Sequence, residues 1–418
     1  MQDNTTSEDE VLTLIIGQLV AYGYASVAQT VADATGATTD MMPSTKLADL
    51  IQTAKERMDV DESDDVDYQD KDYDPSEDSL EPESAGFTGL DGKSANYNKP
   101  VPEYVQLYYT QHKGPCQTAI FSTDGRFAAT GSHDSSLKLL DVSKMKNRTG
   151  EASDKPVIRT LYDHTAPVND LSFHPNGLVL ASCSDDQSIK LFDLSKTGVK
   201  RAFRYLQDAQ PVNSISFHPS GDFLLAGTHD AAVRIYDVKT LQCFTNSTAD
   251  IHRGPITQIR YSHTGKLFAT SSADGSVRIW DSVSSQCIKQ LEGAHGGAAV
   301  SSVRITKNEK FLLTAGLDSS LRLWDISSGK LIMQYTGHEQ RVEMLQPALT
   351  YNEAYVLMGD EASMDVFCWN TQSGELVKKI PGHNNVVRCV AASPVDNGIL
   401  TCSDDYRARY FDVSKMAF

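Results

Sequence analysis

The feature that most constrains the fold of this chain is a pair of aspartates that recurs along residues 134–412. Six times an Asp is followed seven residues later by a second Asp, and Trp, Phe, Tyr or Leu precedes the second one. The pairs are Asp134/Asp141, Asp186/Asp193, Asp230/Asp237, Asp274/Asp281, Asp318/Asp325 and Asp405/Asp412. A His lies 22 or 23 residues before the first Asp in five of them, at His112, His164, His252, His295 and His383. This period of about 44 residues indicates a chain built from copies of one small unit.

We expect each unit to form a small antiparallel sheet. Segments such as PVNDLSF, LVLASCS and SIKLFDL alternate apolar and polar residues, and turn-forming residues separate them. An irregular unit from Gly337-His338 to Trp369-Asn370, with Ser363 in place of the turn Asp, brings the total to seven. Gly-His near the start and Trp-Asp at the end of such a unit are typical of WD40 repeats. The sequence therefore predicts a mainly β fold, a seven-bladed WD40 β-propeller over residues 101–418.

The closure of the ring can also be predicted. Only six residues follow Asp412, so the last unit has no segment for a fourth strand. The segment EYVQLYYT, residues 103–110, precedes His112 just as KLIMQYT and ELVKKIP precede His338 and His383. We expect residues 103–110 to complete the last blade, because this pairing leaves no open edge in the ring.

Two segments of different composition precede the repeats. Residues 1–58 are predicted to be helical, because Ser7 and Glu10 form a capping box and apolar residues follow at helical spacing. So short a segment with so wide an apolar stripe cannot easily close its own core, and we expect it to homodimerise. Packing against the propeller is the alternative.

Residues 59–100 are predicted to form an acidic, flexible linker. Residues 59–92 hold 14 acidic side chains and one Lys, which is too little apolar surface to fold. A docking site for a basic partner is the alternative. Residues 1–100 contain 22 acidic and six basic side chains, a net charge of −16, so the overall charge of −17 leaves only −1 for the repeats.

His252, Thr270, Asp274 and Trp280 include the residue types of a hydrolase triad. His295, Thr314, Asp318 and Trp324 repeat the same set one unit later. Catalysis needs one such set at one cleft, whereas a repeated set is expected of a structural network, since a buried polar group without a partner costs about 1–3 kcal/mol. We therefore interpret both sets as structural tetrads and predict no catalytic residue and no enzymatic activity.

No pattern predicts a cofactor or a metal site. The seven Cys include no C-x-x-C pair and are expected to be free thiols in a reducing compartment. The histidines recur once per unit, so they would lie in different blades, and His174 and His218 are expected to be exposed loop residues. The N-terminal MQDNTTSEDE has no targeting character, and no run is long and apolar enough to span a membrane.

Direct contact with RNA is left open by the sequence. Basic side chains gather at Lys196, Lys200, Arg201 and Arg204, and again at Arg388, Arg407 and Arg409. An RNA contact, an acidic peptide and ordinary surface are all consistent with these clusters, although the net charge of −1 favours ordinary surface.

Five stretches resemble the fifty-kilodalton WD40-repeat subunits of the cleavage stimulation factor. They are PVIRTLYDH (156–164), KRAFRYLQDA (200–209), SFHPSGDF (216–223), GHNNVVRC (382–389) and TCSDDYRARYF (401–411). The segment LTLIIGQLVAYGYASVAQTVAD (12–33) also resembles a LisH-type dimerisation motif. Because WD40 periodicity alone says little about function, these stretches carry the family assignment.

The resemblance implies a non-enzymatic scaffold in the nucleus, needed for 3′-end cleavage and polyadenylation of messenger RNA precursors. In that family the N-terminal helices form a homodimer and the propeller binds the seventy-seven-kilodalton HAT-repeat subunit. A third subunit, with an RRM, reads the RNA and would be an indirect partner. Contact with the C-terminal domain of RNA polymerase II is also attributed to the family.

Candidate binding residues follow from position. By match to the family, the dimer interface would consist of Val11, Ile15, Ile16, Leu19 and Tyr22. For partner binding by the propeller we select polar loop residues at strand starts, namely Asn169, Asn213, Glu343 and Arg388. The alternative function is a LisH-WD40 adaptor of another complex, either chromatin-associated, cytoskeletal or a ubiquitin-ligase substrate receptor. The last of these often shows Trp-Asp-x-Arg, whereas Val283 stands at the Arg position after Trp280-Asp281.

Overall fold

The computed structural model describes Val20 and residues 102–147, 155–196, 198–245 and 251–413. The chain divides into two units, Met1–Ser79 and Leu80–Phe418. The predicted dimerisation domain (1–58), its interface residues Val11, Ile15, Ile16, Leu19 and Tyr22, and the predicted linker (59–100) lie outside the described residues, apart from Val20, which is helical. The domain boundaries at residues 58 and 100 stay predictions.

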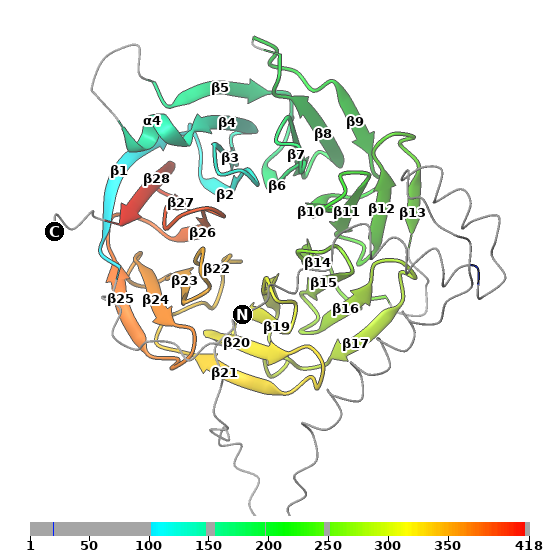
Figure 1. Cartoon of the computed structure of the whole chain (residues 1–418), viewed down its shortest axis with the longest axis vertical. Helices are drawn as coiled ribbons and strands as arrows, with labels where there is room; N and C mark the ends of the chain where they lie inside the picture. The colour runs from blue at the N-terminus through cyan, green and yellow to red at the C-terminus, as the bar shows by residue number, and fades with distance from the viewer. Residues whose placement is uncertain (1–19, 21–101, 148–154, 197, 246–250, 414–418) are drawn as a thin grey trace, which may run out of the picture. The chain divides into compact units, whose positions relative to one another are not determined.

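The described part of the second unit is a seven-bladed β-propeller, as the repeats predicted. Seven four-stranded antiparallel sheets are arranged radially, and the first strand of each lies nearest the centre (Figure 1). The described residues contain no helix that is long and apolar enough to cross a membrane.

The strand bounds follow the repeat closely. Blade 1 comprises β2 (Cys116–Phe121), β3 (Phe127–Ser132), β4 (Ser136–Asp141) and β5 (Val157–Tyr162). Blade 2 comprises β6 (Val168–Phe173), β7 (Val179–Ser184), β8 (Ser188–Asp193) and β9 (Arg204–Gln207). Blade 3 comprises β10 (Val212–Phe217), β11 (Phe223–Thr228), β12 (Val233–Asp237) and β13 (Cys243–Thr245). Blade 4 comprises β14 (Ile256–Tyr261), β15 (Leu267–Ser272), β16 (Val277–Asp281) and β17 (Cys287–Leu291).

Blade 5 comprises β18 (Val300–Ile305), β19 (Phe311–Gly316), β20 (Ser320–Asp325) and β21 (Leu331–Tyr335). Blade 6 comprises β22 (Ala348–Leu349), β23 (Tyr355–Gly359), β24 (Val366–Asn370) and β25 (Leu376–Ile380). Blade 7 comprises β26 (Val387–Ala392), β27 (Ile399–Ser403), β28 (Arg407–Val413) and β1 (Tyr104–Gln111). A short helix, α4 (Val142–Lys146), follows blade 1's β4, and the Asp141 side chain caps its first turn.

The apolar core is divided among the blade interfaces. Each of seven buried clusters takes side chains from two neighbouring blades, for example Phe268 and Trp280 of blade 4 with Leu225 of blade 3. The second strand of a blade is covered on both faces, and β15 is accordingly buried at five of its six positions. Outer strands such as β17 alternate between partly buried and exposed positions, because one face meets solvent.

The segment for which ring closure was predicted forms β1. It is the outermost strand of blade 7 and pairs antiparallel with β28, with Tyr104 opposite Val413 and Gln111 opposite Arg407. Figure 1 shows β1 beside β28 at the junction of the first and last blades. The ring is thus joined by hydrogen bonds between strands far apart in the sequence.

Candidate functional site

Blade 4 brings together the four side chains of the first predicted tetrad. His252 Nε2 lies 2.7 Å from the Thr270 hydroxyl oxygen, and Trp280 Nε1 donates to the same oxygen at 2.9 Å. Because the indole is only a donor, the Thr270 proton is free for His252 Nε2, which assigns the histidine proton to Nδ1. That nitrogen lies 2.8 Å from Ser276 Oγ and 3.5 Å from the Asp274 carboxylate. Ser276, which the sequence analysis missed, donates to Asp274 at 2.6 Å and is a fifth member.

Blade 5 repeats this arrangement. Thr314 Oγ1 lies 2.8 Å from His295 Nε2 and 2.9 Å from Trp324 Nε1. His295 Nδ1 lies 2.8 Å from Asp318. Blades 1, 2 and 7 contain the histidine, hydroxyl and carboxylate without the Trp, as His112/Thr130/Asp134, His164/Ser182/Asp186 and His383/Thr401/Asp405.

The electrostatics of the tetrads suit structural hydrogen bonding. Burial raises the pKa of Asp274, but hydrogen bonds from His252 and Ser276 outweigh it and hold that pKa well below its usual range. Burial lowers the pKa of His252, so at neutral pH a neutral imidazole faces a charged carboxylate. Thr270 is fully buried, and its hydroxyl oxygen forms hydrogen bonds with His252 Nε2 and Trp280 Nε1 of the same blade. Each network therefore ties the loop before the inner strand to the middle of the sheet.

Blade 3 replaces the histidine with a carboxylate. Asp208 lies 22 residues before Asp230, where other blades have His. It accepts a hydrogen bond from the Tyr236 hydroxyl at 2.7 Å and pairs with Arg234 Nε at 3.0 Å. Arg234 also pairs with Asp230 at 2.9 Å, so in blade 3 one guanidinium links Asp208 to the turn Asp.

The prediction that Ser363 takes the place of the turn Asp in blade 6 is wrong. The backbone N–H groups of Glu339 and Ser363 both donate to the carboxylate of Asp360, which therefore serves as the turn Asp. Asp360 lies 22 residues after His338, the spacing seen in other blades, so the sequence did contain the signal.

His338 itself is unlike the other histidines. In blade 4 Phe268 pairs with Trp280, and the equivalent pair in blade 6 is Val356 with Trp369, which places Met358 where Thr270 would be. With no hydroxyl there, both ring nitrogens of His338 lack a hydrogen-bond partner among the described residues. The ring packs edge-on against Trp369, with centroids 5.3 Å apart, and burial lowers the pKa of His338 to about 4.

Two of the predicted partner-binding residues, Asn169 and Asn213, lie at β-bulges. The register of the first two strands shifts at this position in each blade except blade 6. A bulge re-aims the side chain, and both amides point to the next blade. Asn169 Nδ2 donates to the Val212 carbonyl at 3.0 Å, and Asn213 Nδ2 to the Ile256 carbonyl at 2.7 Å. The structure thus gives both residues contacts between blades, and their binding of a partner stays a prediction.

The other two, Glu343 and Arg388, contact each other. Arg388 forms an ion pair with Glu343 and a second one with Asp404 at 2.7 Å. Next to Glu343, the apolar side chains of Val342 and Met344 are 74% and 39% exposed. The charged pair therefore lies beside exposed apolar surface on the irregular loop of blade 6.

His174 and His218 are not simply exposed loop residues, as had been expected. Both are half-buried and lie against the neighbouring blade. Their Nε2 atoms lie 3.1 Å from the Gly221 carbonyl and 3.3 Å from the Gly265 carbonyl. Gly265 has a φ of +78°, and a Cβ at this residue would lie 2.5 Å from His218, so the close approach requires glycine.

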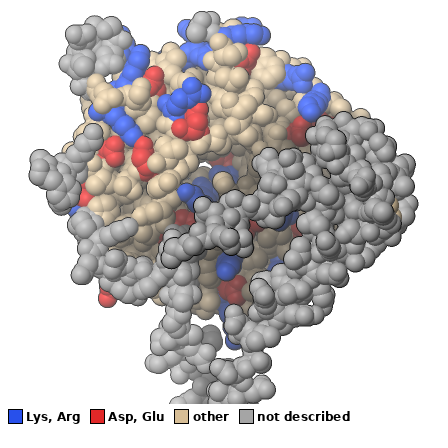
Figure 2. Space-filling model, in the orientation of Figure 1, with Lys and Arg blue, Asp and Glu red and all other residues tan. Residues whose placement is uncertain are grey.

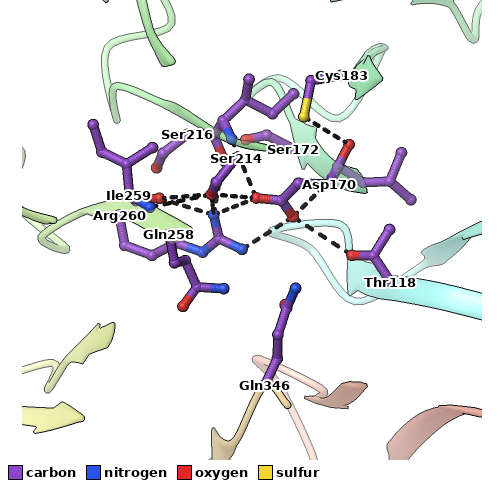
Figure 3. Close-up of polar contacts among 12 residues, drawn as sticks. Thr118, Asp170, Ser172, Cys183, Ser214, Ser216, Gln258, Ile259, Arg260 and Gln346 are labelled. Carbon is purple, nitrogen blue, oxygen red and sulfur yellow. Dashed lines mark hydrogen bonds and ion pairs between the residues drawn. The ribbon is translucent and has the colours of Figure 1, made fainter. Parts of the chain in front are cut away.

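A buried ion pair at the central channel was not predicted. Asp170 on β6 pairs with Arg260 on β14 at 2.6 and 3.0 Å, and Ser214 on β10, between them, donates to Asp170 at 2.6 Å (Figure 3). Basic side chains are visible at the wall of the channel (Figure 2). A polar residue recurs every 44 residues at Asp170, Ser214, Gln258, Ser302 and Gln346, and this spacing is the sequence signal that could have revealed the site.

These side chains cap the inner edges of the blades. An inner strand has no neighbour on its channel side, so its N–H groups need other acceptors. Asp170 accepts from Ile215 N at 3.1 Å, Ser214 from Ile259 N at 3.1 Å, and Gln258 from Val303 N at 2.9 Å. We call this series the inner belt. It links blades 2 to 5 around the channel.

Comparison with protein families agrees with this architecture. The model of the WD domain, G-beta repeat, matches residues 104–141, 155–193, 203–237, 245–281, 285–325 and 374–412. The chain belongs to the WD40 repeat family. The irregular blade 6 contains the longest unmatched stretch within the WD40 propeller, in keeping with its missing tetrad hydroxyl and its two-residue inner strand.

Individual relatives match over shorter segments. Cleavage stimulation factor subunit 50 of Arabidopsis thaliana is 46% identical over 112 residues, which cover 27% of this chain and 26% of that protein. This match confirms the resemblance to that subunit. Nuclear distribution protein nudF of Aspergillus terreus is 35% identical over 96 residues, 23% of this chain and 18% of that protein. The matched segments thus span about a quarter or less of these relatives.

Among solved structures, the β-propeller domain of Cps50 (Swd1) from Myceliophteria thermophila superposes with a TM-score of 0.64. It covers 75% of this chain and 100% of that chain at 17% sequence identity. At this identity the likeness shows the fold alone.

Proposed function

We propose that this chain is a non-enzymatic scaffold subunit of a nuclear cleavage stimulation factor, needed for 3′-end cleavage and polyadenylation of messenger RNA precursors. The observation that carries this proposal is the 46% identity to cleavage stimulation factor subunit 50 over 112 residues. The five stretches that resemble the same family support it. So does the chemistry of the tetrads, whose hydroxyl and imidazole groups bond to each other inside the blades.

In this proposal the propeller binds the HAT-repeat subunit through the first residues of the inner strands and the loops before them. The loop of blade 6 offers the chemistry that a protein interface needs, because Val342 and Met344 are exposed apolar anchors beside the Arg388–Glu343 pair. Asn169 and Asn213 lie at corresponding positions of blades 2 and 3. The RRM subunit and the C-terminal domain of RNA polymerase II are further partners in the proposal, the former an indirect one.

The proposal includes homodimerisation through Val11, Ile15, Ile16, Leu19 and Tyr22. A dimeric scaffold holds two copies of every attached module. Two RNA-reading subunits in one assembly then gain effective concentration on a repetitive RNA element, so modest affinity at each site becomes tight overall binding.

A second candidate function is that of a LisH-WD40 adaptor in a different complex, of the chromatin, cytoskeletal or ubiquitin-ligase type. The match to nudF at 35% identity is the specific observation in its favour. The two candidates differ in their partners and therefore in what purifies with the protein.

The deciding experiment is affinity purification of the tagged full-length protein from nuclear extract, followed by mass spectrometry. Stoichiometric recovery of a HAT-repeat protein and an RRM protein supports the processing-factor proposal. Recovery of motor, chromatin or ubiquitin-ligase components without them overturns it. Val342→Asp tests the blade 6 loop, and Val283→Asp is its matched control, since Val283 is 93% exposed on a different blade. We expect only Val342→Asp to reduce recovery of the HAT-repeat protein.

A further inference from the structure

We propose that the central channel of the propeller holds a small oxyanion of the phosphate type, bound by Arg304 of blade 5 and Gln258 of blade 4. The proposal concerns the inside of the ring and is independent of the partners proposed above.

The first observation is an unbalanced charge. Arg304 on β18 donates to Gln258 Oε1 at 2.8 Å and to the Val303 carbonyl at 3.3 Å, and it has no ion pair with any described residue. Arg260, one blade earlier at the same strand position, is paired with Asp170. Among Asp170, Arg260 and Arg304 there are thus two guanidinium groups and one carboxylate, which leaves the charge of Arg304 without an ion pair among the described residues.

An unpaired charge at this place is costly. Burial, and then the positive charge of Arg260, lower the pKa of Arg304 to about 9, so the side chain still carries its charge at neutral pH. Arg304 is half-buried, so part of its hydration is lost, and such charges are normally paired because that desolvation cost is not recovered otherwise. An anion in the channel supplies the missing charge, and a planar guanidinium offers two parallel donors that match two oxygens of an oxyanion.

The second observation is an unpartnered donor beside Arg304. Gln258 is only 1% exposed, and its Nε2 has no hydrogen-bond partner among the described residues. Its orientation is fixed, because Oε1 accepts from Val303 N at 2.9 Å and from Arg304. In Figure 3 the amide of Gln258 is directed away from the Asp170–Arg260 pair and toward Gln346. Since Nε2 is enclosed, contact with an anion requires a neighbouring side chain such as Gln346 to rotate.

The third observation is a break in the inner belt at the same place. Ser302 follows Gln258 in the belt, yet its hydroxyl has no partner among the described residues. Asp170, Ser214 and Gln258 each accept from the backbone N–H of the residue 45 positions later. For Ser302 that residue is Pro347, which has no N–H. Blades 6 and 7 are instead linked through their backbones, with Gln346 N donating to the Arg388 carbonyl at 2.8 Å. The polar groups next to Arg304 thus have hydrogen-bonding capacity that the protein does not use.

Small side chains lie at the corresponding positions of the next blades. Where blades 4 and 5 have Arg260 and Arg304, blades 6 and 7 have Ala348 and Ala391. The space-filling view shows an opening at the centre of the ring with basic side chains at its wall (Figure 2). At this strand position the side chains of blades 6 and 7 are therefore smaller than those of blades 4 and 5.

The test is equilibrium dialysis of the full-length protein with radiolabelled inorganic phosphate at constant ionic strength. We expect saturable binding of about one phosphate per chain, with a dissociation constant below about 10 mM. Arg304→Gln is expected to weaken it by about tenfold or more, since it removes a charge-assisted bond. Arg126→Gln is the matched control, because the Arg126 side chain is 68% exposed at a surface pair, and it should leave the affinity unchanged.

A second variant guards against misfolding of Arg304→Gln. Ala391→Glu adds a negative charge at the position of blade 7 that corresponds to Arg304, so it should weaken phosphate binding by repulsion while the protein stays folded. Absence of saturable binding to the wild-type protein would overturn the proposal. Equal binding by wild type and Arg304→Gln would overturn it as well. Neither result bears on which proteins purify with the chain.

Discussion

Replacing Thr270 with valine should expose what one tetrad contributes to the stability of the propeller. Valine has the shape of threonine but no oxygen, so the change removes the shared partner of His252 Nε2 and Trp280 Nε1 without leaving a cavity. His252 Nε2 and Trp280 Nε1 then have no hydrogen-bond partner, although His252 and Trp280 are only 4% and 2% exposed. At about 1–3 kcal/mol for each buried unsatisfied group, the expected loss is about 2–6 kcal/mol. This is a large share of the 5–15 kcal/mol of a typical domain.

The assay is urea unfolding at 25 °C followed by tryptophan fluorescence. The three tryptophans, Trp280, Trp324 and Trp369, all lie in the propeller, so their emission reports its unfolding in the full-length protein. Thr240→Val is the matched control, because Thr240 lies on an exposed turn and should change the unfolding free energy by less than about 0.5 kcal/mol.

A double mutant sharpens the test. Trp280→Phe removes the indole donor, so in the Thr270→Val background it also removes one unsatisfied group. It should therefore cost less there than in the wild type, by about 1 kcal/mol. If Thr270→Val unfolds within about 0.5 kcal/mol of wild type, or if the two substitutions are additive, the tetrads do not stabilise the blades as argued.

Three further results are expected from the same assay. Asp170→Asn leaves Arg260 enclosed without a carboxylate and should cost about 3–5 kcal/mol, and a loss below about 1 kcal/mol would contradict the role given to this pair. His338→Phe should make the unfolding free energy less sensitive to acid. The pKa of His338 is about 4 in the folded state and about 6.5 in the unfolded state, so the unfolded state binds the proton first. The stability of the wild type should therefore fall as the pH drops from about 6.5 to 4. The variant should lose up to about 3 kcal/mol less than wild type over that range, and equal pH profiles would refute this. Gly265→Ala should reduce the unfolding free energy by about 1–3 kcal/mol more than Gly293→Ala does. Both glycines have a positive φ, but only at Gly265 would the added Cβ have a neighbour within 4 Å. Equal losses would exclude the close contact as the cause.

Much of the fold could be predicted because its repeat is local in sequence. The turn Asp, the hydroxyl of the second strand and the aromatic residue of the third lie within one unit, so spacing alone brings Thr270, Asp274 and Trp280 together. The prediction of Ser363 in place of Asp360 was wrong, because Ser363 lies seven residues before Asn370 and blade 6 departs from that spacing. The 22-residue spacing from His338 would have corrected it.

Contacts between blades were harder to predict, since they depend on how sheets face each other. The bulges that turn Asn169 and Asn213 toward the next blade follow from strand register, which the sequence of one strand does not determine. In the sequence Asp170 is one polar position of an alternating strand, and its partner Arg260 lies two blades away. His174 was assigned to an exposed loop because the loop that covers it belongs to another blade.

The pairing of β1 with β28 has a consequence for synthesis of the protein. Gln106 and Arg409, which bond across this seam, are 303 residues apart. At about 5–20 residues per second, the ribosome needs about 15–60 s to make the intervening chain. Throughout that interval β1 has emerged without its partner, and its tyrosines and strand edge are open to other nascent chains. The seam thus delays completion of the ring until the ribosome has made β28, however early the other blades fold.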